Sequence, residues 1–167
     1  MNRRLILGGI AAAAVLSATG IGLAVADSSN HGTGPAAYGR PSGGAASGDA
    51  VRTARTGLGQ ILVDSNGRTL YLFEKDSATS STCYGACASA WPPATIAGAL
   101  DAGTGASAAF LGTVRRTDGT IQLSYNGHPL YYYAGDANAG DTTGQGLLQF
   151  GAKWYVLGAN GAKIDND

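Results

Sequence analysis

Two cysteines and one histidine are the residues of this sequence best suited to chemistry. Cys83 and Cys87 stand four positions apart in the stretch CYGAC, and His128 is the one histidine in the part that carries folding signals. On a helical turn, this spacing brings two α-carbons within the range that a disulfide can bridge. We therefore predict a Cys83–Cys87 disulfide that clips an irregular segment locally.

The same side chains permit a second interpretation. Two thiolates and an imidazole are a ligand set that suits copper, so Cys83, Cys87 and His128 define an alternative copper- or redox-handling site. A catalytic dithiol of the thioredoxin type has two residues between its cysteines, not three. The prediction is therefore a structural disulfide with no cofactor and no catalytic residue, and copper is the alternative.

Two aromatic motifs, TLYLF and PLYYY, are each followed by an aspartate. Alternate side chains of a strand share a face, so we expect the rings to form a core and each aspartate to accept hydrogen bonds from turn amides or a tyrosine hydroxyl. A paired ligand site across a twofold axis is the alternative. The two carboxylates do not favour a hydrolase, because the sequence supplies no separate acidic residue whose pKa would be raised for proton donation. The residues concerned are Tyr71, Phe73 and Asp76, and then Tyr131, Tyr133 and Asp136.

These motifs belong to an internal duplication. Residues 51–76 align with residues 111–136 at a constant offset of sixty positions without a gap, and nine of the 26 positions are identical. Self-similarity of this kind is the signature of a repeated structural unit. Repeat one is assigned to residues 51–108 and repeat two to residues 109–167.

The elements expected around the motifs are short strands. QILVD and TIQLSY each lead into Asn-Gly, a pair that tolerates the positive φ of a two-residue hairpin turn. A third Asn-Gly follows KWYVLGA, and an Asp-Gly turn divides FLGTVRRTDGTIQL. The sequence therefore predicts an all-β fold: a compact antiparallel domain of two duplicated hairpin repeats with quasi-twofold symmetry. One short helical turn is expected at 83–90, capped by Ser81 or Thr82 and ended by Pro92-Pro93, and GDTTGQG is expected as a surface loop.

The amino-terminal part resembles an export signal. Arg3 and Arg4 precede an apolar run without charge, and Ala24-Val25-Ala26 supplies small residues for cleavage. We expect residues 1–26 to be a signal peptide, with an uncleaved membrane anchor as the alternative. Residues 27–50 are rich in Gly, Ser, Ala and Pro without a hydrophobic period, which predicts a disordered linker. An exported protein with closely spaced cysteines fits an oxidising, extracytoplasmic location, secreted or at the cell surface.

The charge of the chain limits its partners. Without Arg3 and Arg4, nine Lys and Arg face eleven Asp and Glu, a net charge of about −2. The absence of a basic run in the sequence argues against nucleic acid as a partner, and a membrane contact is expected only through an uncleaved amino-terminal segment. The expected partner is a cell-envelope ligand or protein that the sequence does not specify.

Together, GQILVDSNGRTLYLFEKD, CYGACASAWPP, QLSYNGHPLYYYAGD and GDTTGQG resemble the bacterial secreted-repeat lipoproteins. Their signature is Tyr-x-(Phe/Trp/Tyr)-x-x-Asp, and it fits residues 71–76 and 131–136. The resemblance extends over about residues 53–160. It implies an exported bacterial β-repeat protein, and this chain differs from the lipoprotein members in lacking a cysteine for acylation. We therefore expect a non-enzymatic module with a binding or scaffolding role at the cell surface.

Overall fold

The computed structural model describes residues 50–165. The predicted signal peptide or anchor and the predicted linker lie outside the described residues, apart from Ala50, which begins the first strand. Within residues 50–165, none of the helices has the length and apolar character needed to cross a membrane.

The described chain consists mainly of short strands. Nine strands are joined by turns and loops, with one short α-helix and one 3-10 turn among them. In chain order the elements are β1 (Ala50–Thr56), β2 (Gly59–Asp64), β3 (Tyr71–Phe73), α1 (Ala86–Ala90), β4 (Asp101–Ala102), η1 (Ala108–Phe110), β5 (Leu111–Arg115), β6 (Ile121–Tyr125), β7 (His128–Pro129), β8 (Leu148–Gln149) and β9 (Ala152–Val156).

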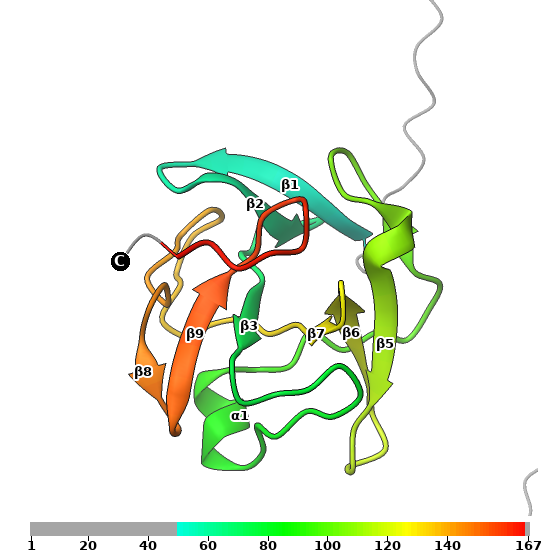
Figure 1. Cartoon of the computed structure of the whole chain (residues 1–167), viewed down its shortest axis with the longest axis vertical. Coiled ribbons are helices and arrows are strands. Elements are labelled where there is room, and N and C mark those ends of the chain that lie inside the picture. Colours follow the sequence, from blue (N-terminus) through cyan, green and yellow to red (C-terminus); the bar gives the residue numbers. More distant parts are fainter. Residues whose placement is uncertain (1–49, 166–167) are drawn as a thin grey trace, which may run out of the picture. The chain divides into compact units, whose positions relative to one another are not determined.

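The strands form three small sheets with the orders β2-β1-β4, β3-β9-β8 and β5-β6-β7. Figure 1 shows β3 and β7 near the centre, with the β1–β2 and β5–β6 hairpins and the β8–β9 pair around them. All strand pairs are antiparallel except β1 with β4, which is parallel. The prediction of an all-β, largely antiparallel fold is confirmed.

The two long hairpins are the repeated unit. β1 pairs with β2 from Val51 opposite Asp64 to Thr56 opposite Gly59. Sixty residues later, β5 pairs with β6 from Leu111 opposite Tyr125. In each copy the chain then turns at Asn-Gly and runs back through the aromatic motif. The duplication seen in the sequence is therefore a duplication of structure.

The Asn-Gly turns differ between the copies. In the second copy both Asn126 (φ 48°) and Gly127 (φ 78°) have positive φ, as a two-residue hairpin turn requires. In the first copy only Gly67 does, and the amide of Asp64 bonds instead to the carbonyl of Arg68 at 2.9 Å. The first turn is longer because the Asp64 carboxylate accepts the amides of Asn66 and Arg68, at 2.8 and 2.9 Å. The expectation of a two-residue turn is wrong there.

The helical turn lies within the predicted range, since α1 spans Ala86–Ala90. Its expected capping residues are wrong: the N-cap is Gly85, and no side chain caps the helix. Thr82 bonds to Asp76 instead. The amide of Trp91 bonds to the carbonyl of Cys87 at 2.7 Å, and Pro92 then ends the helix.

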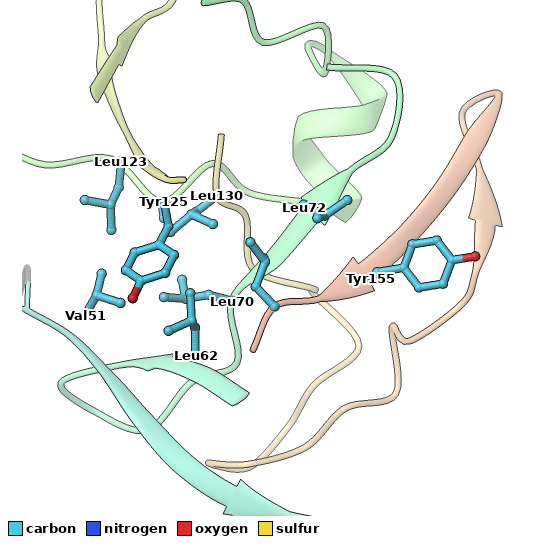
Figure 2. Close-up of a cluster of buried hydrophobic side chains, with 10 residues drawn as sticks. Val51, Leu62, Leu70, Leu72, Leu123, Tyr125, Leu130 and Tyr155 are labelled. Carbon is cyan, nitrogen blue, oxygen red and sulfur yellow. The ribbon is translucent and has the colours of Figure 1, made fainter. Parts of the chain in front are cut away.

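The interior is divided into two clusters of buried side chains. Figure 2 shows part of one, in which Leu62 and Leu70 from the first repeat lie near Tyr125 and Leu130 from the second. The other cluster contains the signature aromatics, both cysteines and both tryptophans. Its fully buried large side chains are Ile61, Tyr71, Trp91, Tyr131 and Trp154. Each cluster draws on both repeats, so the repeats share their core.

Candidate functional site

The two signature motifs meet at their first tyrosines. The amide of Tyr71 donates to the carbonyl of Tyr131 and the amide of Tyr131 donates to the carbonyl of Tyr71, each at 2.9 Å. These residues hold the same position in the two repeats. The point between them is therefore the centre of the quasi-twofold relation.

Each signature tyrosine bonds to the aspartate of the other repeat. The hydroxyl of Tyr71 donates to Oδ2 of Asp136 at 2.6 Å. In return, the hydroxyl of Tyr131 donates to Oδ2 of Asp76. Tyrosine and aspartate thus belong to one motif in the sequence but to two reciprocal pairs in the structure.

The second oxygen of each aspartate holds a loop. Oδ1 of Asp76 accepts the amide and hydroxyl of Thr82, at 2.8 and 2.7 Å. Oδ1 of Asp136 accepts the amide and hydroxyl of Thr143, at 3.0 and 2.5 Å. Each carboxylate therefore accepts three hydrogen bonds, one from a buried phenol and two from a threonine.

The two phenols stay protonated well above neutral pH. Burial raises the pKa of Tyr71 above its ordinary value, and the Asp136 carboxylate raises it further. Burial and the Asp76 carboxylate raise the pKa of Tyr131 in the same way. An ionised phenol would lie unsolvated beside a carboxylate, so these tyrosines are hydrogen-bond donors and not nucleophiles or bases.

Four aromatic rings stack in a row across the quasi-twofold centre. Trp91 and Trp154 form the middle, with ring centroids 4.0 Å apart and planes inclined by 6°. Phe73 of the first repeat stacks on Trp154 at 4.0 Å, and Tyr133 of the second repeat lies on Trp91 at 4.3 Å. The outer rings therefore pack crosswise, like the tyrosine–aspartate pairs.

The tryptophans were not among the residues that the sequence singled out. Tyr71 meets Trp91 edge-on at 5.3 Å, and Tyr131 meets Trp154 edge-on at 5.1 Å. Both indole N–H groups donate to Gln149, from Trp91 to Oε1 at 2.8 Å and from Trp154 to the carbonyl at 3.2 Å. Trp91 and Trp154 are thus equivalent members of the two repeats.

The sequence also gave no signal for Arg116, whose side chain is only 1% exposed. Its guanidinium donates to Oγ of Ser81 at 2.6 Å, to Oε1 of Gln122 at 2.8 Å and to the carbonyl of Cys83 at 2.7 Å. Ser81 in turn bonds to the hydroxyl of Tyr131 at 2.6 Å. The network connects the cysteine segment to one of the signature tyrosines.

Cys83 and Cys87 form a disulfide, as predicted, with their α-carbons 5.2 Å apart. His128 lies at the start of β7. Among residues 50–165, no cluster of three or more His, Cys, Asp or Glu side chains is arranged to hold a metal ion. A disulfide supplies no thiolate, so the alternative copper set would require reduction and rearrangement.

The loop GDTTGQG has a structural role beyond that of a surface loop. Thr143 bonds to Asp136, as described above, and Gly144 is buried against the rings of Trp91 and Tyr71. A Cβ atom at Gly144 would lie 2.7 Å from the Trp91 ring. Glycine is therefore needed where this loop covers the aromatic stack.

Two pockets open at the ends of the signature strands. One, of about 290 Å³, is lined by residues that include Arg68 and is called the Arg68 pocket. The other, of about 410 Å³, includes His128 and is called the His128 pocket. Five lining positions of one correspond to five of the other at the sixty-residue offset: Arg68 with His128, Tyr132 with Leu72, Tyr133 with Phe73, Ala134 with Glu74, and Asp136 with Asp76.

The pockets share a frame but differ in chemistry. In the Arg68 pocket, Tyr132 and Tyr133 present phenol rings. In the His128 pocket the corresponding positions are apolar, and Lys163 forms an ion pair with Glu74 at 2.8 Å. Burial lowers the pKa of His128 and so favours the neutral form of its imidazole. The arrangement is a duplicated site whose copies have diverged.

Comparison with known proteins agrees with this duplicated architecture. The family model described as a secreted repeat of unknown function matches the chain twice, over residues 52–95 and 112–158. These segments contain most of each long hairpin and both signatures. No curated protein and no solved structure matches the chain. The two matches together cover more than half of the sequence, and the chain belongs to this family of secreted repeats.

Proposed function

We propose that this protein is an exported, non-enzymatic binding module whose two signature repeats form one rigid frame with a ligand pocket at each end. Its ligand is a component of the bacterial cell envelope. The observation that carries the proposal is the equivalence of the Arg68 and His128 pockets, five positions of which correspond across the duplication. A pocket that is present in both repeats with a different lining supports two sites that take different ligands.

The frame supports this role because its parts are fixed before any ligand binds. The reciprocal pairs Tyr71–Asp136 and Tyr131–Asp76 tie the base of each pocket to the opposite repeat. The ring of Tyr133 is held against Trp91 at 4.3 Å. A pre-organised site loses less conformational entropy when it binds, which favours affinity.

The state of the signature side chains favours binding over catalysis. Asp76 and Asp136 each accept three hydrogen bonds within the frame. The raised pKa values of Tyr71 and Tyr131 keep their phenols protonated. A general acid or base must exchange its proton near the operating pH, so this set is suited to positioning. The proposed function needs no cofactor.

Retention on cell envelopes tests the proposal. The chain from Asp27 onward would be mixed with washed envelopes of the bacterium that produces it and sedimented over a range of concentrations. We expect saturable retention. Tyr133→Phe with Asn138→Ala alters the Arg68 pocket, whereas His128→Gln with Lys163→Gln alters the His128 pocket. Leu148→Ser, at an exposed leucine of β8 that lines neither pocket, is the matched control.

At least one pocket variant should reduce retention several-fold while its melting temperature stays near that of the wild type. The Leu148→Ser control should be retained like the wild type. The proposal is overturned if the wild type shows no saturable retention, or if both pocket variants are retained as well as the control.

A further inference from the structure

The Arg68 pocket contains a guanidinium held in a fixed orientation. It lies over the Tyr132 ring, 3.8 Å from the centroid, and its Nε donates to Oδ2 of Asp64 at 2.8 Å. The side chain of Asp64 is only 5% exposed, whereas that of Arg68 is 56% exposed. Among the hydrogen bonds of residues 50–165, none is donated by the terminal nitrogens of Arg68. The terminal nitrogens of Arg68 are therefore pre-oriented hydrogen-bond donors, and the charge of the guanidinium is already paired with Asp64.

Two further groups in this pocket can bond to a ligand. The hydroxyl of Tyr133 forms no hydrogen bond with another residue of the described chain, and it can both donate and accept. Asn138 uses its amide nitrogen toward Asp141 at 3.3 Å, which leaves its Oδ1 as an acceptor. The pocket thus offers donors and acceptors together, as a ligand with several hydroxyl groups requires.

The charges around the pocket favour a neutral ligand. An anion beside Arg68 would also lie in the pocket that Asp136 lines, and a cation drawn to Asp136 would meet the Arg68 guanidinium. Both charged groups already have polar partners, in Asp64 and in Tyr71 with Thr143. A neutral ligand avoids the desolvation and repulsion that an ion of either sign would meet.

Apart from Thr69, the remaining lining of the pocket is apolar. Pro92 and three alanines line the pocket beside the two tyrosines. Polarised C–H groups of a hydroxylated ring pack favourably on aromatic and small apolar surfaces, because aromatic faces carry partial negative charge. A volume of about 290 Å³ is at the lower end for ligand sites and suits one small ring at a time.

We propose that the Arg68 pocket binds one uncharged sugar ring of an envelope glycan. Its hydroxyl groups would bond to the terminal nitrogens of Arg68, the Tyr133 hydroxyl and Asn138. This inference rests on the proposed binding function and names the ligand class of one of its two pockets. The His128 pocket lacks the phenols and contains an ion pair, so it provides an internal comparison.

Titration with defined sugars tests this assignment. The chain from Asp27 onward, labelled with nitrogen-15, would be titrated with glucose, galactose, mannose, N-acetylglucosamine and the disaccharides cellobiose and N,N′-diacetylchitobiose. We expect at least one to cause saturable shifts of backbone amides in residues 132–139. Glucuronate and glucosamine, which carry a charge, should bind more weakly. Raising the salt from about 0.05 to about 0.5 M should leave the affinity for the neutral sugar unchanged, because no ion pair forms.

Conservative variants separate ligand contacts from folding. Tyr133→Phe keeps the ring on Trp91 and removes only the hydroxyl, so the dissociation constant should rise about threefold to tenfold. Arg68→Lys keeps the charge beside Asp64 but loses the planar fork, and should weaken binding to a similar extent. Leu148→Ser, which lines neither pocket, should change the affinity less than about twofold.

The assignment is overturned if none of these sugars causes saturable shifts in residues 132–139, or if a charged sugar binds best. It is also overturned if Tyr133→Phe and Arg68→Lys bind the neutral sugar like the wild type. If envelope retention still depends on Tyr133 while sugars fail, the ligand class is wrong and the proposed binding function stands. If retention is absent too, both are wrong.

Discussion

Tyr71 and Tyr131, which hold the same position in the two repeats, bond to each other through both of their backbone amides, at 2.9 Å in each direction. The hydroxyl of each tyrosine also donates a hydrogen bond to the aspartate of the opposite repeat. Neither signature is complete within its own repeat. A hairpin with one apolar face is at best marginally stable alone in water, and the duplication solves this by giving each copy the partner it needs.

The reciprocal pairs should contribute measurably to stability. Tyr71→Phe removes the bond to Asp136 and should lower the free energy of unfolding by about 1.5–3 kcal/mol, the range for hydrogen bonds to charged groups. In a double-mutant cycle with Asp136→Asn, the two losses should be less than additive. Tyr133→Phe is the matched control, because its hydroxyl bonds to no described residue, and should change stability by less than about 0.5 kcal/mol. Additive losses in denaturant titrations would show that the pair is not coupled.

Arg116 should be a residue on which folding depends. Arg116→Met leaves the carbonyl of Cys83 and Oε1 of Gln122 without their buried donor. Because an unsatisfied buried group costs about 1–3 kcal/mol, we expect a loss of at least about 2 kcal/mol. Arg115→Met, at the exposed neighbour, should lie within about 0.5 kcal/mol of the wild type. Equal effects of the two substitutions in urea unfolding would contradict the importance of the buried network.

The disulfide between Cys83 and Cys87 should contribute modestly to the free energy of unfolding. Cys87→Ser opens a loop so short that the loss should be about 2 kcal/mol in the chain-entropy model. The double variant with Cys83→Ser should lose about the same amount, since the bond is already absent in the single variant. Intact mass analysis of the exported wild type should show both cysteines oxidised. Two free thiols in protein kept from reductant would count against the disulfide and favour the copper alternative.

His128 should make stability depend on mildly acidic pH. Burial lowers its pKa from the ordinary 6.5, so folding favours the neutral imidazole. Its contribution is therefore present above about pH 6.5 and is lost as the pH falls through the lowered pKa of the folded state. Glu74, Asp76 and Lys163 line the same pocket, so the comparison with His128→Gln isolates the imidazole. The wild type should lose more stability than His128→Gln between about pH 7 and 5. Parallel stability curves would refute the assignment.

The hairpins could be predicted from sequence because their signals are local. The Asp-Gly pair identifies the β5–β6 hairpin, the Asn-Gly pairs mark the turns that follow β2 and β6, and the constant offset of sixty residues relates the two copies. The meeting of Tyr71 with Asp136 could not be foreseen, because each motif contains its own tyrosine and its own aspartate. Only the tertiary arrangement decides that the phenol reaches the other copy.

The equivalence of Trp91 and Trp154 could not be predicted from the sequence for a different reason. Trp91 and Trp154 are 63 positions apart, so the offset of sixty that holds up to Asp136 no longer aligns them. The length of the loops changes in the same region: Asp76 bonds to the residue six positions later, but Asp136 to the residue seven positions later. Arg116 gave no signal because an arginine beside a turn is ordinarily exposed.

The central claim is that the two repeats form one folding unit that neither can form alone, and separate expression of the halves tests it most directly. Residues 50–108 and residues 109–165 would each be produced and compared with the whole by two-dimensional amide NMR. We expect each half to give the narrow amide dispersion of an unfolded chain. Each half lacks the residues of the other repeat that bond to its signature tyrosine and aspartate, and it lacks the tryptophan on which its Phe73 or Tyr133 ring packs. The intact chain should give a dispersed spectrum. A dispersed, cooperatively melting spectrum from either half alone would contradict the claim.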